Sequence, residues 1–269
     1  YMMQHCVKYA IESGKIINGL DATPMGNTVY GAVGYVNSFR IWRSVFELKE
    51  FESRTYDKNR VQPMQEKDLD DVIRYDASSW IERELIMSEL FKDRSECGCF
   101  VHRDDSGTVR GFCLTRPGRI RPFVGPFLAD TDEIAADLLV AASQHLLKPK
   151  TAVNAFIDTP EIHFANPGVY VERVFDQEKK PTGHKLIKSI VCVRDFTRMY
   201  QLVNHTGIDR LVSEFMRTEG LDKSAPRVEA FRETMARSTM NYSRTLAFMT
   251  YERDVLQKKI WGITGPEKG

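Results

Sequence analysis

The sequence has little net charge and no long apolar run. Its 38 basic and 37 acidic residues nearly cancel, which leaves a formal net charge of +1. A chain without a strong field has little to attract nucleic acid or an anionic membrane surface. No run of eighteen apolar residues appears, and no basic-then-apolar signal segment opens the chain. These absences favour a soluble, cytoplasmic protein that binds neither nucleic acid nor a membrane.

Motifs for metal ions and for several enzyme classes are also missing. The five cysteines form no CxxC pair, and the six histidines form neither HxxxH nor HxH with a nearby carboxylate. We therefore expect no metal site, and buried reduced thiols explain the cysteines better than zinc does. The sequence has no GxSxG elbow and no P-loop. Hydrolase and nucleotidase functions therefore find no support.

The length and composition are those of a globular protein. The chain has 269 residues, of which 42% are hydrophobic and 28% charged. A chain of this size forms one large domain or two ordinary ones, and we expect two. The sequence opens at Tyr1 on a pattern typical of the middle of a helix. We therefore expect it to be a fragment of a longer protein.

The hydrophobic pattern predicts alternating helices and strands, which is an α/β (α+β) fold. The first part predicts helix, strand, helix and strand over 2–13, 15–20, 25–33 and 39–48. The second part predicts helices over 66–80, 81–92 and 130–147, and strands over 97–103, 108–115, 120–128 and 151–157. After Phe196 the pattern favours helix, including a long stretch over 226–261.

A short motif occurs twice. Residues 18–24 (Asn-Gly-Leu-Asp-Ala-Thr-Pro) and 154–160 (Asn-Ala-Phe-Ile-Asp-Thr-Pro) each end a predicted strand that follows a predicted helix. The two copies are 136 residues apart, which is a reasonable size for one small α/β domain. We interpret the repeat as a tandem duplication whose first copy lacks its beginning.

Two segments resemble a known superfamily. Residues 20–35 (LDATPMGNTVYGAVGY) resemble the C-terminal signature of GNAT acetyltransferases, in which a strand runs into a helix that carries a tyrosine, then a glycine and an aromatic residue. Residues 116–119 (RPGR), 124–130 (VGPFLAD) and the helix over 133–139 resemble the diverged C-terminal GNAT domain of tandem proteins from bacteria, fungi and nematodes. This second resemblance covers roughly residues 61 to 160.

The resemblance implies an N-acyltransferase, in which acetyl-CoA or another acyl-CoA donates the acyl group to a small-molecule or peptide amine without a metal ion. Tyr30 would be the catalytic residue that protonates the departing thiolate of the coenzyme, because charge builds on sulfur as the amine attacks the thioester. Thr23, Pro24, Gly26 and Asn27 would bind the coenzyme. The alternative for Tyr30 is that its ring simply packs on the helix surface.

The resemblance also implies a domain organisation. Residues 1–48 would be the C-terminal part of a first GNAT domain, and the polar stretch 49–60 would be a linker. Residues 61–200 would form a second, diverged GNAT-like domain, and 201–269 a helical C-terminal region. The expected architecture is a mixed, mostly antiparallel central sheet flanked by helices.

The GNAT pattern fails at the loop that holds the coenzyme pyrophosphate. Such a loop, Q/R-x-x-G-x-G/A, presents backbone N–H groups at a helix N-terminus. In the first copy it would precede Tyr1, and in the second copy the equivalent residues 129–133 have three carboxylates and no glycine. We therefore expect the second domain to shape the acceptor pocket rather than to bind CoA. A non-catalytic GNAT-like scaffold that binds a small molecule or protein remains the alternative function.

Four arginines lie around the predicted strands of the second region. They could bind an acidic group of a ligand, or they could simply be solvated, and the sequence leaves both interpretations open. They are Arg110, Arg116, Arg119 and Arg121.

Overall fold

The computed structural model describes residues 2–14, 17–77, 83–93, 98–148, 152–163, 186–187, 189–202 and 260–262. The chain divides into two compact units. Unit 1 comprises Tyr1–Arg40 and Phe196–Val255, and unit 2 comprises Ile41–Asp195 and Leu256–Gly269. Strands β2 (Val36–Glu47) and β8 (Val191–Leu202) each begin in one unit and end in the other.

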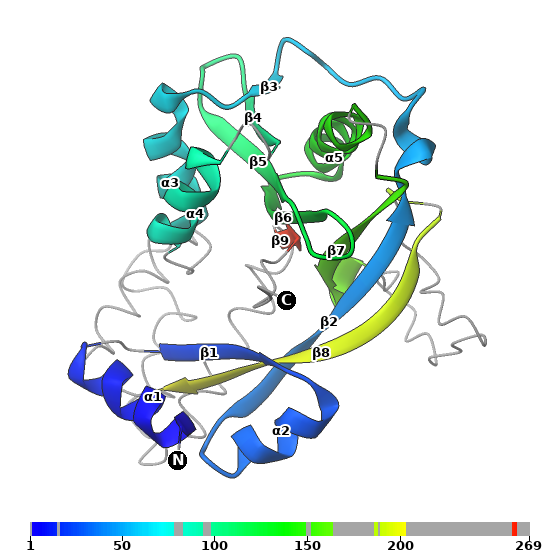
Figure 1. The fold of residues 1–269 in the computed structure, drawn as a ribbon. Helices are drawn as coiled ribbons and strands as arrows, with labels where there is room; N and C mark the ends of the chain where they lie inside the picture. The colour runs from blue at the N-terminus through cyan, green and yellow to red at the C-terminus, as the bar shows by residue number, and fades with distance from the viewer. Residues whose placement is uncertain are drawn as a thin grey trace, which may run out of the picture. The chain divides into compact units, whose positions relative to one another are not determined.

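Unit 1 is built from α1 (Met2–Glu12), β1 (Ile17–Ala22) and α2 (Pro24–Gly31), together with its parts of β2 and β8 (Figure 1). β1 pairs antiparallel with β8 in a register that runs from Ile17 opposite Leu202 to Ala22 opposite Thr197. Ala22, Tyr35 and Met199 form a small buried cluster beneath α1 and α2. The threonine before α2 caps the helix, and a proline stands in its first turn, as helix starts favour.

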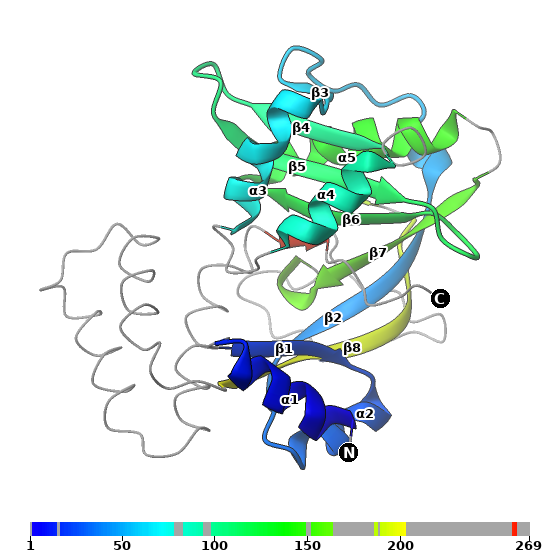
Figure 2. The ribbon, with the colours of Figure 1, turned by 60° about the vertical axis from the view of Figure 1, so that its left-hand side comes forward.

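Unit 2 contains a mixed, mostly antiparallel sheet with the strand order β2-β7-β6-β5-β4-β3. Helix α5 covers one face, and α3 and α4 lie on the other (Figures 1 and 2). The element bounds are β3 (Val61–Pro63), α3 (Leu69–Ala77), α4 (Glu84–Lys92), β4 (Cys99–Arg103), β5 (Val109–Arg116), β6 (Phe123–Ala129), α5 (Asp132–Leu147) and β7 (Asn154–Pro160). Short 3-10 turns lie at Leu48–Phe51, Glu66–Asp68 and Glu161–His163.

The core of unit 2 lies between α5 and the sheet. Leu138 and Leu139 of α5 are fully buried against Phe46 of β2 and Phe127 of β6. Fully burying one such side chain contributes about 1.5–3 kcal/mol, so this layer fixes the frame that the remaining elements use.

Strands β6 and β7 are the parallel pair of unit 2, and they separate soon after they meet. They pair at Phe123 opposite Phe156 and at Val124 opposite Ile157. Farther along β6, the short strand β9 (Ile260–Gly262) pairs antiparallel, with Phe127 opposite Gly262. The first half of β6 therefore pairs with β7, and its second half pairs with β9.

The predicted elements of the first 160 residues are confirmed with small shifts of their ends, and the region after Phe196 is not. The prediction of helix from Phe196 is wrong for residues 196–202, because β8 continues to Leu202 and pairs with β1. Residues 201–202 and 260–262 of the expected helical region 201–269 are strand, and the rest of that region lies outside the described residues.

The polar stretch 49–60, expected as a linker, lies within unit 2. Leu48 and Phe51 are fully buried in the core next to α5. The Gln144 amide donates hydrogen bonds to the carbonyl oxygens of Phe51 (3.0 Å) and Arg54 (2.7 Å). This segment is therefore held to α5 by both apolar and polar contacts.

Of the described helices, none is long and apolar enough to cross a membrane. Among the free cysteines, Cys99, Cys113 and Cys192 are buried and Cys6 is exposed.

Candidate functional site

The residues expected to bind the coenzyme form the first turn of α2. Thr23 caps the helix, and its hydroxyl oxygen accepts a hydrogen bond from the backbone N–H of Gly26 at 3.2 Å. Thr23 and Pro24 are exposed, and the first turn has no acidic residue. A helix start without a carboxylate is favourable for an anion through the helix dipole. Pro24 has no N–H, however, and the N–H groups of Gly26 and Asn27 both bond to Thr23. The side chain of Asn27 is already engaged, because its amide donates to the Asn37 side chain at 2.8 Å.

Tyr30 lies on α2 one turn beyond this start, and its ring packs against Gly26. A Cβ at Gly26 would come within 2.8 Å of the Tyr30 ring, so glycine is what allows the ring to lie there. The Tyr30 and Tyr35 rings are 6.2 Å apart and tilted by 58°. The structure thus brings together Thr23, Gly26 and Tyr30, and it leaves the Tyr30 ring half-buried.

The start of α5, unlike that of α2, carries negatively charged side chains. Thr131 caps this helix by accepting a hydrogen bond from the N–H of Ile134 at 3.3 Å, and Asp132 and Glu133 occupy the first turn. Asp130 precedes the cap. A polyanion at this position would meet carboxylates instead of free N–H groups, which is unfavourable.

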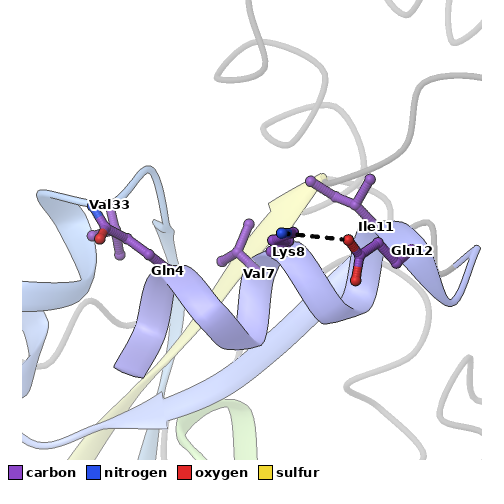
Figure 3. A pocket seen from close by; sticks show the side chains of 6 residues that line it. All are labelled: Gln4, Val7, Lys8, Ile11, Glu12 and Val33. Carbon is purple, nitrogen blue, oxygen red and sulfur yellow. Dashed lines mark ion pairs between the residues drawn. The ribbon is translucent and has the colours of Figure 1, made fainter. Parts of the chain in front are cut away.

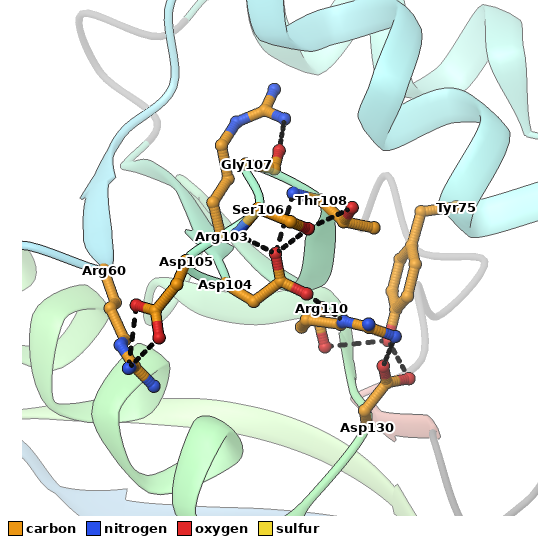
Figure 4. A network of polar contacts seen from close by, with 10 residues as sticks. All are labelled: Arg60, Tyr75, Arg103, Asp104, Asp105, Ser106, Gly107, Thr108, Arg110 and Asp130. Carbon is orange, nitrogen blue, oxygen red and sulfur yellow. Dashed lines mark hydrogen bonds and ion pairs between the residues drawn. The ribbon is translucent and has the colours of Figure 1, made fainter.

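A polar network holds Asp130 in place (Figure 4). The Tyr75 hydroxyl lies 2.8 Å from the Asp130 carboxylate and 3.0 Å from the Arg110 carbonyl oxygen. Arg110 forms ion pairs with Asp130 at 3.7 Å and with Asp104 at 2.7 Å. Burial, and then the Asp130 carboxylate, raise the pKa of Tyr75 far above its ordinary value, so this phenol stays protonated at neutral pH.

The same network closes the turn between β4 and β5. The Asp104 carboxylate accepts hydrogen bonds from the backbone N–H groups of Ser106 and Thr108, both at 3.0 Å, and from the Ser106 hydroxyl at 2.6 Å. These bonds and Arg110 lower the pKa of Asp104. Arg110 therefore serves a structural network and does not belong with Arg116 and Arg121, which lie at the other end of β5 and beside β6. No sequence motif indicated the role of Tyr75, which only the meeting of α3 with β5 and β6 reveals.

A hollow of about 360 Å³ lies beside α1 in unit 1 (Figure 3). Its lining is mainly apolar, and the Lys8–Glu12 pair at 3.7 Å is well exposed at its side. The lining residues are Gln4, Val7, Lys8, Ile11, Glu12 and Val33. Of the described residues that line it, only Lys8 and Glu12 are titratable, and they pair with each other at an exposed position, so the hollow offers little chemistry. Across the described residues, no cluster of His, Cys, Asp or Glu could hold a metal ion.

Comparison with known proteins identifies the central part of unit 2. Residues 72–166 match the family model described as an acetyltransferase (GNAT) domain. This range runs from α3 through β7. The chain matches no curated protein.

Among solved structures, the chain is similar to a GCN5-related N-acetyltransferase from Kribbella flavida, with 17% identity over 74% of this chain and a TM-score of 0.46. It is also similar to a GCN5-related N-acetyltransferase from Anabaena variabilis, with 11% identity over 75% of this chain and a TM-score of 0.45. The match covers 46% of the first of these chains and 50% of the second, so this chain spans about half their length. On the evidence of the family model, the chain contains a GNAT acetyltransferase domain.

Proposed function

We propose that the protein is an acyl-CoA-dependent N-acyltransferase, with acetyl-CoA as the favoured donor and an amine as the acceptor. The match of residues 72–166 to the GNAT acetyltransferase model carries this proposal. The α/β arrangement of unit 2, with α5 connecting the diverging strands β6 and β7, is consistent with it.

The proposal includes two GNAT-like copies in tandem, with 1–48 as part of the first and 61–200 as the second. Support comes from the repeated motif, because in both copies its aspartate lies on a strand opposite an arginine. Asp21 lies opposite Arg198 and Asp158 lies opposite Arg43, and each arginine binds its carboxylate through two nitrogens. A chance repeat of sequence would have no reason to repeat this pairing.

In the proposed reaction, the amine nitrogen attacks the acyl carbonyl carbon, the carbon–sulfur bond breaks, and the amine gives up a proton. Tyr30 donates a proton to the departing thiolate, and the proton that the amine loses passes through water to the Tyr30 phenolate. The start of α2, formed by Thr23, Pro24, Gly26 and Asn27, faces the anionic part of the coenzyme, which the positive end of the helix dipole attracts. Because the start of α5 is acidic, unit 2 contributes the acceptor side instead.

The first test is calorimetric titration of acetyl-CoA into the chain, followed by chromatographic detection of free CoA in the presence of a panel of amines. Chromatography is preferable to thiol reagents because Cys6 is exposed and would itself react. Binding with amine-dependent release of CoA supports the proposal. Absence of both binding and release contradicts it for this chain.

The role of Tyr30 is tested by Tyr30→Phe, with Tyr9→Phe as the matched control because Tyr9 is exposed on α1. Loss of a general acid lowers kcat by about 10²-fold or more, while KM changes little. Tyr9→Phe should leave both constants unchanged. Equal activity of Tyr30→Phe and the unmodified chain would reduce Tyr30 to a packing residue.

The alternative function is a non-catalytic GNAT-like scaffold that binds a small molecule or protein. The observation that favours it is the acidic start of α5, where Asp132 and Glu133 occupy the first turn. Failure of acetyl-CoA to bind in the titration above would favour this alternative.

A further inference from the structure

The loop between β5 and β6 is a compact, strongly basic turn. Residues 116–121 (Arg-Pro-Gly-Arg-Ile-Arg), called the basic turn below, contain three arginines and no acid. A Cβ at Gly118 would lie 2.1 Å from the backbone oxygen of Arg121, a separation that only glycine permits. The chain therefore folds back tightly at Gly118, and this close approach fixes where Arg119 and Arg121 emerge.

Two phenylalanine rings support the arginines of this turn. Phe123 lies opposite Arg116 across β5 and β6, and opposite Phe156 across β6 and β7. The guanidinium carbon of Arg116 is 4.5 Å from the centre of the Phe123 ring, and that of Arg121 is 5.3 Å from the centre of the Phe156 ring. A guanidinium stacked on a ring keeps its N–H groups at its edge, where they can bind the two oxygens of an anion.

The partner of Arg43 differs from those of Arg121. Arg43 also lies over the Phe123 ring, at 5.4 Å, but the Asp158 carboxylate accepts two hydrogen bonds from it at 2.8 and 2.7 Å. In the described part of the chain, Arg121 contacts the Phe156 ring and donates to the Asn154 amide oxygen, and both of these partners are neutral. The sheet thus pairs buried Arg43 with a carboxylate, whereas the described partners of Arg121 carry no charge.

The basic turn is also separated from the acidic start of α5. It precedes the first residue of β6, whereas Asp130 follows the last one. Seven strand residues span about 23 Å, so opposite charges lie well apart at the two ends of β6.

We propose that the basic turn, with Arg121 as its central contact and Phe123 and Phe156 as its floor, binds an anionic oxygen group of the acceptor, a carboxylate or a phosphate. The acceptor would then be an amine that also carries an acidic group. This inference rests on the proposed acyltransferase function, since it names the class of acceptor for the same domain.

The test is calorimetric titration of the full chain with glutarate, with inorganic phosphate and with glutaramide, the uncharged analogue of glutarate. Glutarate or phosphate should bind and glutaramide should not. Arg121→Gln should weaken anion binding at least tenfold, whereas Arg121→Lys, which keeps the charge but loses the planar fork, should weaken it less. Gly118→Ala should cause a similar loss without removing any charge.

Arg60→Gln is the matched control, because it removes one positive charge next to β3, an edge strand that is separated from β5 by β4. It should leave anion binding unchanged. Circular dichroism and thermal melting of each variant separate loss of binding from loss of folding. If Arg121→Gln unfolds, the comparison of Gly118→Ala and Arg121→Lys with Arg60→Gln decides the question.

Equal binding of glutarate and glutaramide, or equal losses in Arg121→Gln and Arg60→Gln, would overturn the proposal. Displacement of glutarate by acetyl-CoA through its phosphates would overturn the assignment to the acceptor, whereas independent binding of the two supports it. If acetyl-CoA does not bind while glutarate still requires Arg121, the acyltransferase proposal fails and the anion site stands.

Discussion

The two copies of the repeated motif have similar sequences and end differently. In both, the aspartate lies in a strand and binds the arginine opposite it, Asp21 with Arg198 and Asp158 with Arg43. In the second copy the threonine follows the aspartate directly. In the first copy Ala22 stands between the aspartate and Thr23. Both segments have seven residues, and the aspartate stands one position earlier in the first copy than in the second.

That shift of the aspartate changes what the threonine does. Successive strand residues point to opposite faces, so Thr159 points away from Asp158 into the core, where it is fully buried. In β1 the fully buried position after the aspartate is taken by Ala22, and Thr23 is moved beyond the strand to cap α2. The comparison shows how the same Thr-Pro pair ends a strand in one copy and starts a helix in the other.

The largest expected difference between the copies concerns the ion pairs. The side chains of Arg43 and Asp158 are 6% and 3% exposed, whereas those of Arg198 and Asp21 are 11% and 10% exposed. Arg43→Ala leaves a buried carboxylate without its cation and should lower the free energy of unfolding by about 3–5 kcal/mol. Arg198→Ala should cost about 1–3 kcal/mol, because water reaches Asp21 more easily. Urea denaturation of both variants measures the difference.

The double variant Arg43→Ala/Asp158→Ala provides the control for that comparison. Because it removes both charges, it should be more stable than Arg43→Ala alone. Equal losses in Arg43→Ala and Arg198→Ala would show that the two pairs are energetically alike despite their different burial.

The threonines should respond with opposite signs. Thr23→Ala removes a helix cap and should destabilise the protein by about 1 kcal/mol. The Thr159 hydroxyl oxygen is buried and has no hydrogen-bond partner in the described part of the chain, so Thr159→Val removes a polar group at little loss of shape and should be neutral or stabilising. Thermal melting measures both. Destabilisation by Thr159→Val would indicate that this hydroxyl binds a water molecule or another group.

The asparagines that begin the two motifs have different partners. Asn154 accepts a hydrogen bond from the cation of Arg121, whereas the Asn18 amide donates to the Tyr35 hydroxyl at 2.7 Å.

The smallest expected effect concerns Tyr35, the partner of Asn18. Burial, and then the nearby Cys6 and Tyr30, raise the pKa of Tyr35 to about 12. The raised pKa favours the neutral phenol in the folded state. The contribution of Tyr35 to the free energy of unfolding is therefore complete below pH 10 and is lost as the pH rises toward 12.

Ultraviolet absorbance during alkaline titration follows this ionisation, and Tyr35→Phe identifies the signal that belongs to Tyr35. The component that titrates near pH 12 should disappear in that variant, whereas Tyr75, whose pKa is raised further, ionises at still higher pH. Persistence of that component would assign it to another tyrosine.

Features with local signals could be predicted from the sequence. The start of α5 follows from a threonine cap and an acidic first turn, and the hairpin turn follows from Asp104 to Gly107, where Gly107 has a φ of 81°. The domain assignment of 72–166 likewise agrees with the resemblance, which was stated for 61–160.

Features that depend on distant partners could not be predicted. The polar residues of β8 showed no pattern typical of a strand. This strand is defined by its pairing with β1, in which Arg198 binds Asp21, a residue 177 positions away in the sequence. The Arg43–Asp158 pair spans 115 residues, and Tyr75 is joined to Asp130 across 55. The predicted site residues around Tyr30 lie close together because they belong to one helix and its cap. The four arginines do not form one group, because Arg110 lies near the start of β5 and the other three lie in the basic turn at its end.

The pairing of β1 with β8 has a consequence for biosynthesis. A ribosome adds about 5–20 residues per second, so the 177 residues between Asp21 and Arg198 take about 9–35 s to make. Throughout that interval the nascent β1 has emerged or is emerging without the strand it pairs with, while the continuous stretch Ile41–Asp195 is completed first. Unit 1 is thus assembled from segments made on either side of this stretch, so β1 stays without its paired strand until β8 has been made.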